Sequence, residues 1–308
     1  MLNGILIVDK PQSFTSHDAI AKLRGILHQR KMGHAGTLDP MATGVLVVLL
    51  GSATKASDHA SGQSKEYCAR LRLGLTTDTQ DITGTVLSES PVQVTEQQLM
   101  LALADFTGTI DQLPPMYSAV QVGGRRLYDL ARQGVEVERQ SREISIDAFE
   151  LLPRQDGMPE NDYDLRVLCS KGTYVRTLCH DVGQALGCGG TMAALRRVRS
   201  GVFRLEDALT LDEVKELFDA GKLEEHLFPT EQIFSDLPAV KLNEAGDVRA
   251  SHGAFFFPNH LAEGRMPPEG ETCRVYDSRG DFCQIGETRP LDKGGFGLFC
   301  KINFVSKD

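Results

Sequence analysis

The stretch HAGTLDPMATGVLVVLL, from His34 to Leu50, joins a turn-rich segment to an uninterrupted apolar run. Gly, Thr and the Asp39-Pro40 pair favour a tight loop, and the apolar residues 45–50 indicate a buried strand. The sequence therefore predicts that Asp39 lies in a loop leading into a core strand. Asp-Pro is often a turn without chemistry, whereas loops fixed on a rigid scaffold often carry catalytic groups. Both interpretations stay open for these residues alone.

Apolar and alternating patterns on either side of this stretch predict a mixed fold. Strands are expected at 4–8, 45–50, 65–74, 116–122, 141–152 and 164–169. Helices are expected at 15–28, 95–105, 127–133, 174–186 and 210–220. Thr15 with Asp18 resembles a capping box, Thr173 is expected to cap the helix 174–186, and Gly123-Gly124 favours a hairpin. The mixture predicts an α+β fold with a mixed, mostly antiparallel sheet.

The character of the sequence changes near residue 230. Residues 228–238 are expected to form a linker, and short strand-like pieces separated by Gly, Pro and Asp follow. These patterns predict two domains, residues 1–232 and a small β-rich domain at residues 236–308.

The composition indicates an ordinary globular protein. Of 308 residues, 41% are hydrophobic, and the longest apolar run is too short to cross a membrane. The N-terminus does not resemble a signal peptide. Seven cysteines without a CxxC spacing favour reduced thiols over disulfides or a zinc site. We therefore expect a cytoplasmic protein without a metal, and a monomer, because no stripe of residues resembles an interface.

Charge is distributed unevenly along the chain. Residues 1–205 carry as many basic as acidic side chains, so residues 206–308 account for the whole net charge of −9. The neutral part contains three basic clusters. They are Lys22, Arg24, Arg30 and Lys31; Arg125 and Arg126; and Arg196, Arg197 and Arg199. Such clusters attract phosphate even on an acidic protein, although each one taken singly is more simply a solvated surface.

A nucleophilic role for Asp39 would need a positive partner and an aromatic ring for a flat substrate. Arg176 could supply the charge, and Tyr67 or Tyr174 the ring. Tyr67 falls on the apolar face of the strand 65–74, where a core tyrosine is the simpler reading. Spacing alone does not bring these residues together. No HExxH, GxSxG, GxGxxG or Walker pattern offers different chemistry.

Eight ordered segments resemble the TruB family of tRNA pseudouridine synthases, and together they span roughly residues 1–205. They are GILIVDKPQSFTS (4–16), GHAGTLDPMATG (33–44), KEYCARLRLG (65–74), TDTQD (77–81), PPMYSA (114–119), GRRLYDLAR (124–132), SKGTYVRTLCHDVG (170–183) and LRRVRSG (195–201). One such segment is weakly specific, but eight in order are strongly specific.

The resemblance implies formation of pseudouridine at position 55, in the T-loop of tRNA, without a cofactor. Asp39 matches the catalytic aspartate, Tyr67 the tyrosine that stacks on uracil and is a candidate for handling the C5 proton, and Arg176 the arginine paired with the aspartate. His34 and Tyr174 match residues near the flipped nucleotide, and Leu195 matches an apolar wall. The three basic clusters would then contact the RNA backbone.

The resemblance also implies a C-terminal domain of PUA type, and the acidic charge of this region opposes binding of RNA. A stand-alone enzyme for the tRNA T-arm, needing no guide RNA, is expected. Two alternatives are a catalytic subunit directed by a guide RNA and a non-catalytic tRNA-binding or tRNA-folding module. The presence of Asp39, Tyr67 and Arg176 together argues against the last.

Overall fold

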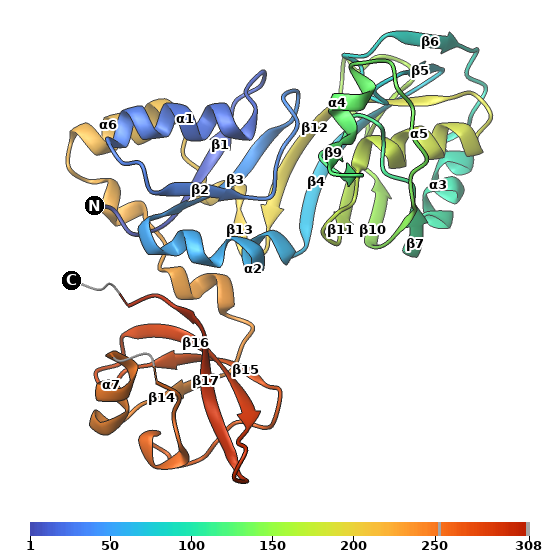
Figure 1. The fold of residues 1–308 in the computed structure, drawn as a ribbon. Helices are drawn as coiled ribbons and strands as arrows, with labels where there is room; N and C mark the ends of the chain where they lie inside the picture. The colour runs from blue at the N-terminus through green and yellow to red at the C-terminus, as the bar shows by residue number, and fades with distance from the viewer. Residues whose placement is uncertain (252–253, 306–308) are drawn as a thin grey trace.

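The computed structural model describes residues 1–251 and 254–305, apart from the side chains of Arg126 and Ser251. A large mixed sheet with helices on it forms the N-terminal part, and a smaller β-rich domain lies beside it (Figure 1). The predicted α+β class is therefore confirmed.

The large sheet contains nine strands of the described chain. They are β1 (Gly4–Lys10), β2 (Met32–Ala35), β3 (Thr43–Leu50), β4 (Lys65–Leu73), β7 (Gly108–Gln112), β10 (Arg142–Leu151), β11 (Asp162–Cys169), β12 (Gly190–Ser200) and β13 (Phe203–Arg204). The main order is β1-β3-β12-β4-β11-β10-β7. The β3–β12 pair is parallel and the other pairs of this sheet are antiparallel, as the prediction of a mostly antiparallel sheet requires.

Burial explains the two kinds of strand pattern. In β4 every second residue from Lys65 to Leu73 is buried, which matches its alternating sequence. In β3 the whole run from Val45 to Leu50 is buried, because both faces are covered. One face packs on the helices at 16–27 and 211–219, and the other lies in a core cluster with the helical segment 51–62, Phe203 and Phe234. Strands covered on both faces have continuous apolar sequences.

Helices of the described chain lie on both sides of this sheet and on the C-terminal domain (Figure 1). They are α1 (Ser16–Leu27), α2 (Ser57–Gly62), α3 (Glu96–Asp105), α4 (Leu127–Ala131), α5 (Val175–Ala185), α6 (Leu211–Asp219) and α7 (Glu244–Ser251). Short 3-10 turns are η1 (Gly51–Ala56), η2 (Leu205–Asp207), η3 (Leu223–His226), η4 (Thr230–Phe234) and η5 (Pro258–His260). The Thr15–Asp18 capping box is present at α1.

The smaller sheet has the order β14-β15-β16-β17. Its strands are β14 (Ala239–Lys241), β15 (Thr272–Tyr276), β16 (Phe282–Pro290) and β17 (Phe296–Asn303). The expected linker at 228–238 is wrong in part, because Ile233 and Phe234 of η4 are buried in a core that includes Ile285 and Phe304 of the C-terminal domain. The segment therefore packs the two domains together.

Two local predictions are wrong. The strand expected at 116–122 is reduced to β8 (Gln121–Val122), which forms a hairpin with β9 (Arg125–Arg126). Thr173 does not cap α5: its hydroxyl donates to the Ser170 carbonyl, and Tyr174 is the capping residue. A further two-stranded sheet pairs β5 (Leu75–Thr77) with β6 (Val86–Glu89).

Candidate active site

Asp39 lies in the loop between β2 and β3, and α1 holds this loop from one side. The Ser16 hydroxyl accepts a hydrogen bond from the Leu38 N–H at 2.8 Å and donates to the Leu38 carbonyl at 3.3 Å. The Pro40 carbonyl accepts from the Ser13 N–H at 2.8 Å. The residues on both sides of Asp39 are thus fixed to the segment that enters α1.

Lys10, at the end of β1, also binds the loop that carries Asp39. Its side chain is fully buried, and the ammonium donates to the carbonyls of Pro11, Phe14 and Pro40, the last at 3.4 Å. Burial lowers the pKa of Lys10 to about 8, and the negative charge of Asp39 opposes this shift. Lys10 is therefore a buried cation close to Asp39.

Arg176 in the first turn of α5 pairs with the Asp39 carboxylate at 3.1 Å. It also lies 3.7 Å from Asp81, and it donates to the Tyr117 carbonyl at 2.6 Å. Its guanidinium carbon lies 5.7 Å from the centre of the Tyr174 ring. The Asp39 side chain is 37% exposed while Arg176 is 7% exposed, so substrate can reach the carboxylate but not the whole ion pair.

Tyr67 on β4 provides an aromatic ring in the same region. It is 9% exposed and belongs to one core cluster with Leu38, Met41 and Leu195. Burial raises the pKa of Tyr67; the charge and a hydrogen bond of Arg197 oppose the rise, while the nearby Asp39 charge adds to it. The ring is therefore a neutral phenol against an apolar wall beside Asp39.

His34 on β2 is half-buried, and its Nδ1 has no hydrogen-bond partner among the described residues. Burial lowers the pKa of His34, and the positive charges of Arg197 and His17 lower it further. His34 is thus a neutral imidazole whose Nδ1 is buried without a hydrogen-bond partner among the described residues.

The predicted basic clusters differ in exposure. Lys22, Arg24, Arg30, Lys31 and Arg125 are exposed, and the side chain of Arg126 lies outside the described part of the structure. Arg196 pairs with Asp9 at 2.7 Å and Arg199 with Glu66 at 3.2 Å. Arg197 is 1% exposed. Its assignment to an RNA-backbone surface is therefore wrong, because a side chain inside the sheet does not reach a phosphate.

The structure adds residues that motif reading left without a role. Asp81 is a second carboxylate beside Arg176, while Lys10 and Ser16 support the Asp39 loop. Asp81, Lys10 and Ser16 all fall within the segments that carried the family resemblance. Polar types inside apolar or turn segments, such as Lys10 at the end of a buried strand, were the available signal.

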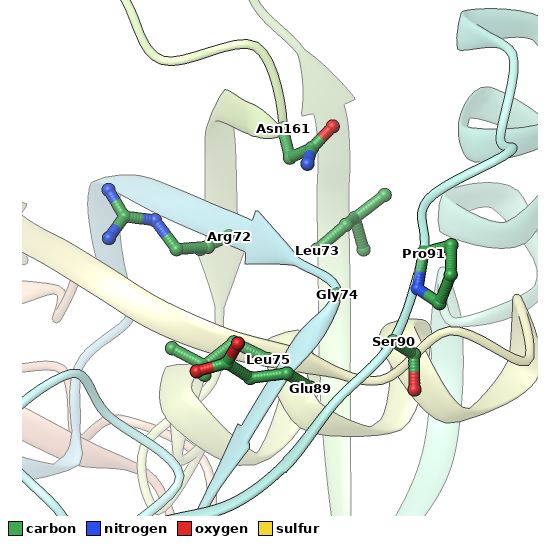
Figure 2. Close-up of a pocket in the computed structure, with 8 residues that line it drawn as sticks. All are labelled: Arg72, Leu73, Gly74, Leu75, Glu89, Ser90, Pro91 and Asn161. Carbon is green, nitrogen blue, oxygen red and sulfur yellow. The ribbon is translucent and has the colours of Figure 1, made fainter.

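The described residues contain no cluster of three or more side chains suited to hold a metal. A hollow of about 540 Å³ lies elsewhere, between the end of β4, the segment from Glu89 to Pro91 and Asn161 (Figure 2). None of the candidate site residues lines it. We therefore confine the site to the surroundings of Asp39.

Comparison with known proteins gives the family. Residues 24–175 match the family model "TruB family pseudouridylate synthase (N terminal domain)", and residues 176–235 match "tRNA pseudouridylate synthase B C-terminal domain". The tRNA pseudouridine synthase B of Bacillus pumilus is 41% identical, over 90% of this chain and 93% of the relative. The chain belongs to the TruB family.

Other TruB relatives support the assignment. The tRNA pseudouridine synthase B of Heliobacterium mobile is 47% identical, over 93% of this chain and 90% of the relative. The tRNA pseudouridine synthase B of Opitutus terrae is 49% identical, over 75% of this chain and 94% of the relative. The chain is therefore a tRNA-modifying isomerase, as the sequence predicted.

Solved structures share the fold. A Cbf5–Nop10–Gar1 complex contains a chain that matches with a TM-score of 0.76 and 26% identity, over 98% of this chain and 85% of that one. An H/ACA RNP bound to a substrate RNA containing 2′-deoxyuridine matches with a TM-score of 0.74 and 25% identity, over 99% and 86%. The two TruB family models meet inside α5, and β12 from the second segment lies in the sheet of the first.

No helix in the two described ranges is long and apolar enough to cross a membrane.

Proposed function

We propose that this TruB protein isomerises the uridine at position 55, in the T-loop of tRNA, with Asp39 as the nucleophile on a flipped-out nucleotide. The observation that carries this proposal is the 3.1 Å pair between Arg176 and a partly exposed Asp39 beside a buried aromatic ring. A uridine inside a folded loop must leave the stack to reach a carboxylate, and extruded bases are held by aromatic stacking.

The proposed steps balance without an external reactant. Asp39 forms a bond to the uridine, the C1′–N1 bond breaks and its electron pair stays on the uracil, and the ring turns so that C5 bonds to C1′. The bond between Asp39 and the nucleotide then breaks, and its electron pair returns to the carboxylate. Loss of the C5 proton and protonation at N1 complete the isomerisation. The same balance holds for attack on the base and for attack on the sugar, and neither route requires a cofactor.

The side chains around Asp39 suit distinct roles in these steps. Arg176 orients the carboxylate, and Leu195 and Tyr67 form the wall against which the uracil stacks. The buried phenol of Tyr67 holds its proton more tightly than usual, which favours stacking over abstraction of the C5 proton. We assign His34 and Tyr174 to contacts with the extruded nucleotide, to which a neutral His34 can donate or from which it can accept a hydrogen bond.

Exposed basic residues on the catalytic domain suit the RNA backbone. Lys22 and Arg24 of α1, Arg30 and Lys31 beyond it, and Arg125 of the β8–β9 hairpin are available. Arg196 and Arg199 are half-exposed and already paired with carboxylates, so they contribute less charge. We infer a T-arm contact built mainly on the exposed residues.

The C-terminal domain offers a second RNA-binding surface, which we call the aromatic–arginine face. It consists of the half-buried rings of Phe255, Phe257 and Phe299 with Arg249 and Arg289. The Phe255 and Phe299 rings stack with centroids 4.8 Å apart, and Arg249 lies 5.4 Å from the centroids of Phe255 and Phe257. Rings beside guanidinium groups bind unpaired nucleotides by stacking and charge. We infer that this face contacts tRNA outside the T-arm.

The proposal includes a stand-alone, monomeric, cytoplasmic enzyme. The curated relatives are named as tRNA pseudouridine synthases, whereas the structural neighbours come from guide-RNA complexes. All seven cysteines are free, which suits a reducing compartment. We infer two domains, residues 1–232 and 236–308, with η4 packing between them.

The decisive assay uses unmodified tRNA and a bare T-arm hairpin, without any guide RNA. We expect the wild type to form pseudouridine at position 55 in both, and Asp39→Ala to bind tRNA with nearly unchanged affinity while its rate falls at least ~10³-fold. Full activity of Asp39→Ala would contradict the role of Asp39 as the nucleophile. Inactivity of the wild type on both RNAs would favour the guided enzyme or the non-catalytic module.

A further inference from the structure

Arg197 on β12 is a buried side chain that spans the loop carrying Asp39. It is 1% exposed and ranks among the largest fully buried side chains of the described protein. Its Nε donates to the Val45 carbonyl at 2.6 Å, and its Nη2 donates to the Gly36 carbonyl at 2.9 Å. Gly36 precedes Asp39 and Val45 follows it, so one guanidinium holds both ends of the loop.

This guanidinium is buried without a carboxylate. Its neighbours Arg196 and Arg199 form ion pairs with Asp9 and Glu66, but no ion pair of the described residues includes Arg197. An isolated charge is costly inside a protein, and an apolar side chain of similar volume would fill the space at lower cost. The cost indicates that a planar group with several donors is needed at this point.

The backbone of Arg197 joins the loop to the strand that carries the aromatic ring. Arg197 pairs with Tyr67 of β4 on one side and with Gly44 of β3 on the other. Gly44 has φ +97°, and a Cβ there would lie 2.2 Å from the Arg197 carbonyl oxygen, so only glycine allows this approach. The Arg197 guanidinium also acts on the Tyr67 phenol, because its positive charge opposes the rise in the pKa of Tyr67 that burial causes.

We propose that Arg197 is a positioning residue of the isomerisation, whose guanidinium fixes the Asp39 loop relative to Tyr67 by binding the Gly36 and Val45 carbonyls. The inference rests on the proposed role of Asp39. The carboxylate must meet a nucleotide held against Tyr67, and a misplacement of about 1 Å lowers a rate about 10²-fold. Lysine does not replace the planar guanidinium of Arg197, because the lysine ammonium is a point charge without planar geometry.

The test compares Arg197→Met and Arg197→Lys with the wild type in single-turnover assays on unmodified tRNA. We expect Arg197→Met to lower the rate at saturating tRNA by about 10²-fold with an unchanged Kd for tRNA, and Arg197→Lys to restore part of the rate. Arg166→Met is the matched control, because Arg166 lies on β11 of the same sheet and pairs with Glu66 and Glu150 away from the loop. It should keep the wild-type rate.

A second readout follows the imidazole of His34 by NMR titration. The charge of Arg197 contributes to the lowered pKa of His34, after burial. Arg197→Met should therefore raise the pKa of His34, whereas Arg166→Met and Arg197→Lys should leave it low. This signal reports the buried charge and would not follow from a general loss of stability.

A wild-type rate in both Arg197 variants would overturn the proposal, and so would a loss of tRNA affinity that matches the loss of rate. If Arg197→Met does not fold, Arg197→Lys decides: a reduced rate with normal affinity supports positioning, and a normal rate overturns it. Asp39→Asn in the same assay distinguishes a failure of the proposed function from a failure of the positioning role of Arg197. Its activity would remove the proposed function, whereas an inactive Asp39→Asn with fully active Arg197 variants would remove the positioning role alone.

Discussion

The Asp39 carboxylate lies 3.1 Å from the Arg176 guanidinium, although the two residues come from distant parts of the chain. The pair is asymmetric, because the Asp39 side chain is 37% exposed and that of Arg176 only 7%. Arg176 is anchored on its buried side by Asp81 and by the Tyr117 carbonyl. The protein thus exposes one carboxylate to solvent and keeps the partner cation inside.

The first prediction separates stability from activity at this pair. Arg176→Met leaves Asp81, whose side chain is 7% exposed, without its cation. The free energy of unfolding should fall by about 3 kcal/mol, since an unpaired buried charge is costly. Adding Asp81→Asn removes that charge and should restore most of the stability but none of the activity. Urea unfolding measures the stability of the variants, and the tRNA assay measures their activity. A double variant that regains activity would contradict this role of Arg176.

Ser16 is predicted to support the loop through a single hydroxyl. Ser16→Ala leaves the Leu38 N–H, next to Asp39, without its 2.8 Å partner, at a cost of about 1–3 kcal/mol. The single-turnover rate should also fall, because the loop loses its tie to α1. Thr210→Ala is the control: it removes the cap of α6 at a cost of about 1 kcal/mol without touching the loop. Equal rates for the two variants would show that Ser16 acts only on stability.

Local sequence signals predicted most of the elements. Thr15, Thr95 and Thr210 each begin a capping box at the expected helix, and β4 alternates as its sequence does. These signals depend on neighbours in the chain, so they survive folding. In the segment 116–122 only Gln121 and Val122 form a strand. The Tyr117 carbonyl instead accepts a bond from Arg176, a long-range contact that no local pattern contains.

Part of the candidate site could be predicted from the sequence. The family motifs single out Asp39, Tyr67 and Arg176, and the structure brings these three residues into one region. The prediction for Arg197 is wrong because a run of arginines resembles a solvated surface. Alternation along β12 turns neighbouring side chains to opposite faces, so Arg197 is buried. The burial of one arginine among three depends on the pairing of β12 between β3 and β4, which residue types do not specify.

Lys10 predicts a pH dependence of stability. Its pKa in the folded protein is about 8, below the ordinary 10.5. Between these values the unfolded chain binds a proton that the folded chain does not, so the Lys10 contribution to the free energy of unfolding rises with pH. Below about pH 8 the full penalty of the buried charge is present.

The measurement compares the wild type with Lys10→Met by urea unfolding at about pH 7 and about pH 9.5. The stability of the wild type relative to the variant should increase at the higher pH. Lys65, whose pKa is also about 8, is present in both proteins, so its effect cancels. A difference that stays constant or shrinks would show that the folded protein does not lower the pKa of Lys10.

Arg289 tests the aromatic–arginine face of the C-terminal domain. Its side chain is 53% exposed, and its guanidinium carbon lies 6.0 Å from the Phe299 ring centre. Arg289→Gln should weaken binding of full-length tRNA and lower the salt dependence of log K by about one unit, because one cation no longer meets the RNA. Binding of the isolated T-arm hairpin should not change.

The matched control for this face is Arg279→Gln, in the turn between β15 and β16, where the side chain is 83% exposed. It removes the same charge from the same domain but not from the aromatic rings. If the two variants weaken tRNA binding equally, the effect is one of overall charge in an acidic domain. If only Arg289→Gln acts, and only on full-length tRNA, the C-terminal domain binds the substrate outside the T-arm through this face, despite the acidic charge of its part of the chain.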